Sequence, residues 1–513
     1  MLGSCTAFSR QGPNFIVDLE QQRTSMIEMH DNQIMPSYNH TLLNENISEI
    51  GMGKYQYTLF LLCGFGWAAD NMYMQALSVI QIPVQLEFKL TNSQVGNLGF
   101  SMMLGMFFGS FIWGIISDIF GRKPAFNLTL AITALFSVST AFAPNFLVLS
   151  ILLALMGFGV GGNMPIDAAL FLEFVPSSHK GLMILMGSFW SIGQLITSVV
   201  AWSILSLPGM MCDPQTSICD SSLNSGWRIV QLSLGLVTVL MVTARVSWFH
   251  LYESPKYLIS KGKFVEACDV LTILAKENDK KLIIQPDDFL LDNKESVQEK
   301  TDYFLHHTLK IMFSKQLYKT TILIALISMF VSLGTCCIHL GNNMFFTFIP
   351  KFLSMGAIQP LSLSETYRNY LIVSLFSIPG PPLAMYACES ILGRRSIMSL
   401  STILVAVCLA LFTLCKTSSQ QLLLTCLAGF FQNCMYAVKD SYTPEVFPTG
   451  IRGSAVGLAA SLGRLMGCFA PILTWYLLDF NVRFPVYISA GLLAMGALLM
   501  AMLPIDTKGA VPH

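Results

Sequence analysis

Gly114-Ile-Ile-Ser-Asp118-Ile-Phe-Gly121-Arg122-Lys123 ends an apolar run with an acidic turn and a Gly-Arg-basic cluster. A second copy, Glu389-Ser-Ile-Leu-Gly393-Arg394-Arg395, follows another apolar run in the second half of the chain. Each copy comes after the second of six apolar spans. Internal repeats of this kind are a feature of duplicated membrane bundles. The pair of turns therefore predicts two related halves.

The composition indicates that lipid is the main solvent of this chain. Hydrophobic residues make up 53% of the 513 residues, charged residues only 12%, and the mean hydropathy is +0.59. So few charges cannot solvate the surface of a globular protein of this length. The formal net charge is 0, and no tract is basic enough to bind nucleic acid. DNA-binding and RNA-binding functions are excluded on this basis.

Twelve segments are long and apolar enough to span a bilayer, which requires roughly 20 residues of helix. They predict an all-α membrane protein with twelve transmembrane helices in two six-helix bundles. The first six are expected at 57–82, 94–116, 124–143, 147–173, 181–206 and 228–251. The second six are expected at 320–349, 369–388, 397–415, 420–441, 453–478 and 484–504.

These spans divide the chain into five parts. Residues 1–56 are polar and predict a largely disordered tail, because they lack the apolar core of a signal peptide. In the long central loop, Phe264, Leu271 and Leu274 recur at helical spacing and predict a short amphipathic helix. That helix is a linker or a gating latch. The parts are the tail 1–56, the first bundle 57–251, the central loop 252–319, the second bundle 320–504 and the tail 505–513.

Basic residues in the short loops predict the orientation, because Lys and Arg concentrate on the cytoplasmic side. Both termini are expected to be cytoplasmic, in the plasma membrane or an endomembrane. The basic residues placed on that side are Arg122, Lys123, Lys180, Arg394, Arg395, Arg452, Lys508 and the lysines of the central loop.

Most of the thirteen cysteines lie inside apolar spans, where a thiol behaves as a small hydrophobe. Cys212 and Cys219 differ, because they lie in a predicted outer loop. In an oxidising compartment they form a disulfide, and otherwise they remain free thiols.

The sequence contains no Cys/His cluster with zinc spacing and no Gly-rich P-loop. We therefore expect no metal and no cofactor. No nucleophile and base stand at a recognisable spacing, so an enzyme is not expected. Energy for any transport is expected from an ion gradient.

Two acids inside predicted spans, Asp70 and Asp167, are candidates for coupling transport to protons. A carboxylate at membrane depth costs several kcal/mol unless it is paired, protonated or facing water. Such a group can take up a proton on one side and release it on the other. The alternative is structural, namely a hydrogen bond or an ion pair with Arg245.

Polar side chains inside the spans are candidates for lining a central substrate cavity. Neutral amides bind hydroxyls or carboxylates, but they also hold helices together, and each alone is more typical of that second role. Trp67 and Trp190 lie near these positions. The candidates are Gln75, Asn163, Gln194, Asn342, Asn343, Gln432, Asn433 and Tyr436.

The duplicated turn resembles the loop signature of the major facilitator superfamily. Three further stretches, at 253–258, 442–453 and 504–509, resemble signatures of its sugar porters. The second copy of the turn departs from the pattern, because Glu389 lies four residues before Gly393 and Tyr386 replaces the leading glycine. The turn acids and the resemblance together imply a cytoplasmic gate network of Asp118, Arg122, Glu173, Glu253, Glu389, Arg394, Glu445 and Arg452.

Within that superfamily the chain is most similar to the branch related to synaptic vesicle protein two. Two stretches carry this resemblance, Gly66-Trp67-Ala-Ala-Asp70 and the Gly-rich stretch 157–176. Glucose-type porters carry a Gln-Gln pair in the seventh span, whereas this chain has Asn342-Asn343. The resemblance therefore supports the fold more strongly than it supports sugar recognition.

Together the patterns predict a secondary active transporter that moves a small polar solute with protons by alternating access. An organic anion, a carboxylate or a phosphate-like compound is the expected solute. A sugar or polyol facilitator or symporter is one alternative, and a non-transporting membrane sensor or vesicle protein is another. The expected partners are the solute, protons and the lipid bilayer, and the chain is expected to be a monomer.

Overall fold

The structure is a computed structural model, and the residues that it describes form helices and no strands. This confirms the all-α prediction. For residues 92, 301–305, 336–353, 363, 471–472, 474–476 and 478–480 the description covers the backbone and not the side chains. The described residues are 39, 41–212, 224–280, 282, 284–289, 301–353, 363–390, 392–415, 417–481 and 483–507.

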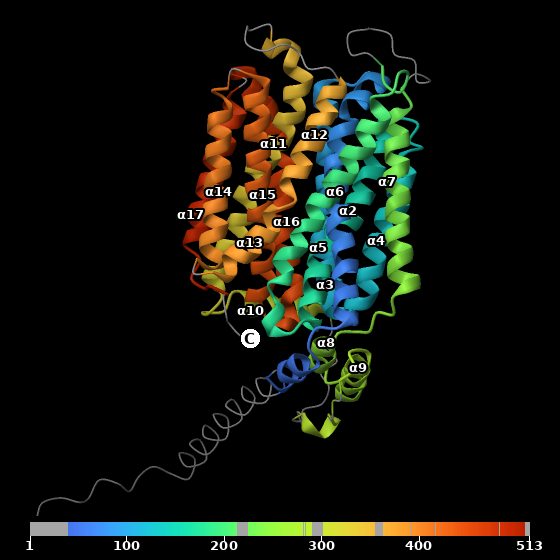
Figure 1. Ribbon diagram of the computed structural model, residues 1–513, viewed down its shortest axis with the longest axis vertical. Helices are drawn as coiled ribbons and strands as arrows, with labels where there is room; N and C mark the ends of the chain where they lie inside the picture. Colours follow the sequence, from blue (N-terminus) through green and yellow to red (C-terminus); the bar gives the residue numbers. More distant parts are fainter. Residues whose placement is uncertain are drawn as a thin grey trace, which may run out of the picture.

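Two groups of roughly parallel helices stand side by side in Figure 1, one from each half of the chain. The first group consists of α2 (Lys54–Phe88), α3 (Asn92–Phe120), α4 (Arg122–Thr140), α5 (Phe146–Phe174), α6 (Leu182–Leu205) and α7 (Gly226–Thr243). The second group consists of α11 (Tyr318–Leu353), α12 (Leu363–Ser377), α13 (Gly380–Glu389), α14 (Gly393–Phe412), α15 (Ser418–Val446), α16 (Arg452–Phe480) and α17 (Phe484–Ala501).

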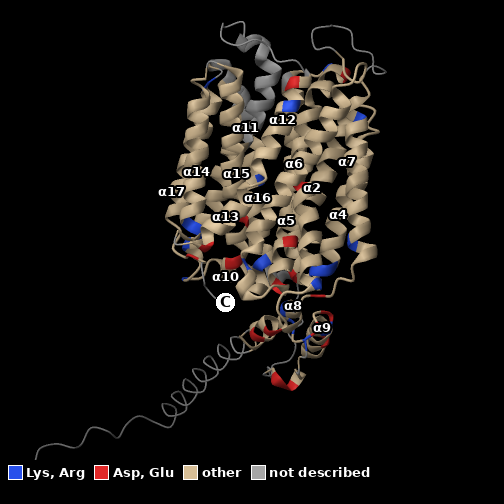
Figure 2. Cartoon of the chain, in the orientation of Figure 1, with Lys and Arg blue, Asp and Glu red and all other residues tan. Residues whose placement is uncertain are grey.

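Ten of the described helices are long and apolar enough to cross a membrane. Helices α2 and α4 lie alongside them and complete the twelve predicted spans (Figure 1). Their lower hydropathy has a local cause, because α2 carries Asp70 and several glutamines and α4 begins with Arg122 and Lys123. Figure 2 shows charged residues gathered at one end of the bundle and few across its middle. A bilayer as solvent requires this distribution.

The eighth predicted span, 369–388, is two helices in the structure. Helix α12 ends at Ser377, and α13 begins at Gly380 after Pro379. Proline has no backbone N–H and fixes φ, so Pro379 interrupts the hydrogen-bond ladder. The sequence around the break, Pro379-Gly-Pro-Pro, explains why a single straight helix does not form.

The two halves meet through α3 against α16 and through α6 against α12 and α15. Glycines make the first contact close. A Cβ atom on Gly114 would meet the carbonyl oxygen of Gly453, and one on Gly457 would meet that of Ser110. In the second contact, Ser198 and Ser374 join their hydroxyls at 3.0 Å. Small residues of this kind allow membrane helices to pack closely.

Short helices gather at one end of the bundle, at the bottom of Figure 1, which we name the α8 face. They are α8 (Pro255–Ser260), α9 (Phe264–Glu277) and α10 (Thr301–Met312). The predicted amphipathic helix is α9, and Leu271 and Leu274 on it are buried. The Asn278 amide, just after α9, donates a 2.9 Å hydrogen bond to Gln56 Oε1 of α2. Helix α9 is thus anchored to the first half.

The end of the N-terminal tail is more ordered than the sequence predicts. Residues 41–50 form a helix, on which Leu43, Ile47 and Ile50 are buried. These three apolar residues recur at helical spacing and pack in the same core cluster as α9. Residues 1–38 and 40, the rest of the predicted disordered tail, lie outside the described residues.

Candidate functional site

A cavity of about 270 Å³ lies between the two halves. Five of the predicted polar candidates line it, and so do Trp67 and Trp190. The five are Gln75, Gln194, Gln432, Asn433 and Tyr436. The side chains of Asn342 and Asn343 lie outside the described part of the chain. The prediction that these amides bind substrate stays a prediction.

Helical spacing explains how the sequence directs polar groups into this cavity. On α2, Asn71, Gln75 and Ser78 are separated by four and three residues and share one face. On α15, Gln432 and Tyr436 are also four residues apart and line the same cavity. Each helix therefore presents an amide-bearing face to the cavity, while its other faces pack against apolar neighbours.

Asp70 does not line the cavity, although Trp67 and Asn71 beside it do. Its side chain is buried, with 1% of the residue exposed. One carboxylate oxygen, Oδ1, accepts a 3.0 Å hydrogen bond from Asn163 Nδ2 on α5. The other oxygen, Oδ2, has no hydrogen-bond partner among the described residues. A buried carboxylate with a hydrogen bond to only one of its two oxygens is costly to keep charged.

The second predicted coupling acid, Asp167, is held in an ion pair. Arg245 Nη2 lies 3.0 Å from Asp167 Oδ2, and both side chains are almost fully buried. The same guanidinium donates to the carbonyl oxygens of Leu62 and Phe126 and lies over the Phe126 ring. A fixed pair of this kind supports the structural alternative that the sequence left open for Asp167.

Arg464 is a cavity residue that the sequence analysis did not select. It lies on α16 and lines the cavity. Within the described part of the chain its guanidinium has no hydrogen bond or ion pair, and it interacts electrostatically with Asp70 across the two halves. The signal was present in the sequence, because Arg464 is a charged residue inside the predicted span 453–478. Such residues mark functional sites in membrane proteins.

Lys439 and Asp440 of α15 also line the cavity. Lys439 Nζ lies 2.7 Å from Asp440 Oδ1, so the two charges largely compensate each other. The ammonium is also 5.1 Å from the centre of the Tyr436 ring. Unlike Arg464, this cation has a carboxylate partner next to it.

An aromatic pair joins the two halves at the cavity. Trp190 of α6 stacks on Tyr436 of α15, with ring centres 5.2 Å apart and planes inclined by 24°. The Tyr436 hydroxyl lies 2.8 Å from Thr335 Oγ1 of α11. The cavity wall therefore combines aromatic faces, amides and an arginine.

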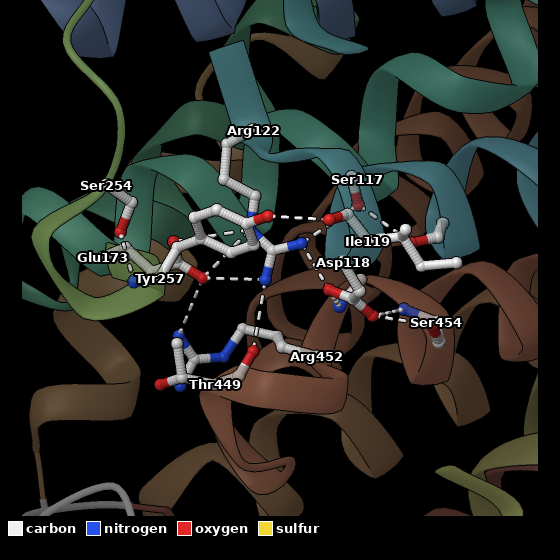
Figure 3. Close-up of polar contacts among 12 residues, drawn as sticks. Ser117, Asp118, Ile119, Arg122, Glu173, Ser254, Tyr257, Thr449, Arg452 and Ser454 are labelled. Atoms are coloured by element: carbon white, nitrogen blue, oxygen red, sulfur yellow. Dashed lines mark hydrogen bonds and ion pairs between the residues drawn. The ribbon is translucent and has the colours of Figure 1, made fainter. Parts of the chain in front are cut away.

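At the α8 face, Arg122 organises the first charge cluster, shown in Figure 3. Its guanidinium pairs with Asp118, donates a 3.0 Å hydrogen bond to Glu173 and reaches the Thr449 carbonyl oxygen at 3.1 Å. Arg452 Nη1 lies 3.8 Å from the same Glu173 oxygen. All of these side chains are buried, so each carboxylate depends on its cationic neighbours.

Asp118 also ties the two halves together. Its carboxylate accepts hydrogen bonds from the backbone N–H groups of Gly453 and Ser454 at 3.2 and 2.6 Å. The Ser454 hydroxyl donates another at 2.6 Å. These N–H groups belong to the first turn of α16, where a helix favours negative charge. The turn that ends α3 thus holds the beginning of a helix in the opposite half.

The duplicated turns adopt matching geometry. Gly121 and Gly393 both have positive φ, 104° and 70°, which favours glycine. Glu253 accepts hydrogen bonds from the backbone N–H groups of Arg122 and Lys123, and Asp506 packs against Gly393 in the second half. The sequence analysis did not select Asp506.

The remaining gate candidates lie at the same face. Arg394 pairs with Glu445, as Arg122 does with Glu173. Glu389 approaches Gly181 of the opposite half. The eight predicted gate residues therefore gather at the α8 face, in two related clusters that meet between the halves.

Two lysines near this face, the half-buried Lys180 and the buried Lys256, lie among other cations. Burial, with Arg394 and Arg452 nearby, lowers the pKa of Lys180 to about 8. Burial and Arg452 lower the pKa of Lys256 on α8 to about 7. Lys180 stands where sugar porters prefer arginine, and its compact ammonium cannot form the two-pronged contact of a guanidinium.

Cys212 is disulfide-bonded in the structure. Its predicted partner, Cys219, lies outside the described residues. In the described part of the chain, no three His, Cys, Asp or Glu side chains converge as ligands for a metal ion.

Comparisons with known proteins match most of this chain. The model of the family "Sugar (and other) transporter" matches residues 36–511. An uncharacterised MFS-type transporter of Schizosaccharomyces pombe is 35% identical, with 91% of this chain and 88% of that protein covered. The synaptic vesicle 2-related protein of Bos taurus is 28% identical over 91% of this chain and 81% of its own length.

A solved structure with the same fold is the proton:xylose symporter bound to 6-bromo-6-deoxy-D-glucose. Its TM-score is 0.67 at 18% identity, and the match covers 89% of this chain and 98% of the symporter. The family match and the fold confirm the resemblance that the duplicated turns and sugar-porter signatures predicted. The chain belongs to the sugar (and other) transporter family of the major facilitator superfamily.

Proposed function

We propose that this transporter moves a small organic anion together with a proton, by alternating access through the cavity between its halves. The observation that carries the proposal is Arg464, a cavity guanidinium without an ion pair or hydrogen bond among the described residues. A cation at membrane depth is costly unless something compensates its charge. A carboxylate or phosphate on the solute would do so, because the guanidinium fork matches both groups.

A neutral sugar fits this charge distribution less well. Once Asp70 is protonated, a neutral sugar would leave the Arg464 charge without a counter-charge, whereas the second cavity cation, Lys439, already has Asp440. The cavity amides and the Trp190–Tyr436 stack can bind the rest of an organic anion by hydrogen bonds and apolar contact. The family name keeps a sugar or polyol as the second candidate solute.

A sensor without transport activity is less well supported. A collapsed centre would favour that function, whereas this structure has a cavity of about 270 Å³. Asp70 and Asn163 do not line it, so the proposed coupling acid is occluded in this conformation. In an alternating-access cycle, occlusion of one group in one state is expected.

The clusters at the α8 face are proposed to form the cytoplasmic gate. Asp118 and Arg122 reach Ser454 and Thr449 of the opposite half, so the two halves are joined there. Separation of α3 from α16 would break these contacts and open the cavity to the cytoplasm. Rigid-body movement about such an interface is the usual mode of change in these proteins.

Uptake into proteoliposomes tests the proposal. The probes are lactate, succinate, benzenesulfonate and inorganic phosphate, compared with xylose and glucose, with and without an inwardly directed proton gradient. We expect uptake of at least one anion, stimulated about tenfold by the gradient. Uptake of the sugars alone, indifferent to the gradient, would contradict the proposal and favour the facilitator.

The variant Asp70→Asn is expected to abolish the gradient stimulation, bringing it from about tenfold to about onefold. Asparagine has a similar size but takes up no proton. The matched control is Asp440→Asn, which removes an acid of the same cavity that is already paired with Lys439. The control should keep its gradient dependence. Solute-driven proton flux that survives Asp70→Asn unchanged would remove Asp70 from the coupling role.

A further inference from the structure

Two opposite charges lie at the cavity between the halves: Arg464 lines it, and Asp70 lies between Trp67 and Asn71, which also line it. Asp70 lies on α2 and Arg464 on α16, and their opposite charges attract each other across the two halves. No hydrogen bond or ion pair joins them in the described structure. Arg464 thus attracts the Asp70 carboxylate and also lines the cavity that a solute would enter.

Other charged groups near the pair largely cancel each other. The other charged groups near Asp70 are Asp167 of α5 and Arg245, in the π-helical segment Ala244–Trp248 that follows α7, and these two form an ion pair. Asn163 of α5 supplies the one hydrogen bond to the Asp70 carboxylate. On the cavity side of Arg464, Lys439 and Asp440 are also paired. Arg464 is therefore the charge near Asp70 that has no ion-pair partner among the described residues.

We infer that Arg464 is shared by Asp70 and the transported anion, so that the anion binds Arg464 when Asp70 takes up a proton. The inference rests on the proposed function and specifies its coupling. The proton goes to the Asp70 carboxylate, whose Oδ2 atom has no hydrogen-bond partner among the described residues. The anion takes over the charge compensation that Asp70 provides when it is ionised.

Charge arithmetic explains why the two ligands would move together. The empty site, with ionised Asp70 and Arg464, carries no net charge, and the site loaded with a proton and a monovalent anion also carries none. A site holding only the anion or only the proton carries one net charge. In a poorly solvated interior that charge is strongly unfavourable, so the half-loaded forms cross rarely. Transport of a monovalent anion is therefore electroneutral, with one proton per anion.

A double-mutant cycle tests the shared arginine without any solute. The melting temperatures of purified wild type, Asp70→Asn, Arg464→Gln and the double variant are compared at pH 8 and pH 5. If the two charges interact, the change in melting temperature of the double variant differs from the sum of the two single changes by about 2 °C or more at pH 8. The difference should shrink at pH 5, because protonated Asp70 no longer attracts Arg464. The control cycle of Asp70→Asn with Lys439→Gln should be additive.

A transport measurement completes the test, with lactate and benzenesulfonate as monovalent probes. Background is subtracted with protein-free vesicles, and a potassium diffusion potential is applied with valinomycin. Uptake by the wild type should not respond to the potential, whereas uptake by Asp70→Asn, which carries the anion alone, should respond. Benzenesulfonate has no neutral form at these pH values, so it crosses no membrane as a free acid.

Different results would contradict the shared arginine and the proposed transport of anions with protons. The inference of a shared arginine would be overturned if the changes in melting temperature were additive at pH 8. It would also be overturned if uptake by the wild type responded to the potential. Both results are possible even if anions are transported. If the changes in melting temperature are not additive but none of the four anions is taken up, the proposed function is refuted instead. Asp70 and Arg464 would then form a structural contact only.

Discussion

Replacing Arg464 with glutamine is expected to reduce anion uptake by about 100-fold. The substitution removes charged hydrogen bonds worth about 3 kcal/mol, and each 1.4 kcal/mol changes an equilibrium tenfold. Because Arg464 has no hydrogen bond or ion pair to other described residues, its loss should not unfold the protein. Initial uptake rates of lactate, succinate, benzenesulfonate and phosphate in proteoliposomes measure the effect.

Two control variants separate charge from geometry. Arg464→Lys keeps the positive charge but lacks the planar fork, so an intermediate loss of about tenfold is expected. Arg483→Gln removes an exposed arginine before α17 and should leave uptake unchanged. If Arg464→Gln transports all four anions at the wild-type rate and affinity, Arg464 is not the anion site.

The variant Arg122→Met is expected to destabilise the folded protein by about 3–5 kcal/mol. It leaves Asp118 and Glu173 buried without their principal cation, which is far more costly than losing an exposed pair. We expect low yields after membrane extraction and a lower melting temperature, measured by the unfolding of purified protein.

A second substitution makes the cause identifiable. In Arg122→Met with Glu173→Gln, one orphaned carboxylate becomes neutral, so part of the lost stability should return. Lys263→Met breaks an exposed ion pair with Glu266 on α9 and should change the melting temperature little. A melting temperature of Arg122→Met equal to that of the wild type would show that the cluster does not hold the α8 face together.

The fold could be predicted from the sequence because lipid leaves a spanning segment little choice but a helix. The predicted span 147–173 corresponds to α5, Phe146–Phe174, and 484–504 corresponds closely to α17. The break after Ser377 is different, because the average hydropathy of the segment Ser364–Glu389 stays high across Pro379 and gives no sign of the break. The helix at 41–50 was not predicted for a related reason: its four apolar residues are too few to stand out in a polar tail.

The site could be predicted only in part. Gln75 and Gln432, chosen because they are polar residues inside predicted spans, do line the cavity. Whether a buried acid is paired depends on a partner far away in the chain, as Asp167 and Arg245 illustrate. Arg464 was not predicted because the candidates were chosen among acids and amides, and this arginine stands among small and apolar neighbours in the sequence. Its importance becomes evident once α16 is packed against the first half.

The Trp190–Tyr436 stack gives the protein a built-in optical reporter of its own movement. The two rings belong to opposite halves and lie 5.2 Å apart, so any rocking that separates α6 from α15 must unstack them. Indole emission depends on its immediate surroundings, and the colour and intensity of Trp190 fluorescence should therefore follow the conformational cycle without an attached dye. In a Trp190→Phe variant that transports normally, the solute-dependent part of the fluorescence should disappear.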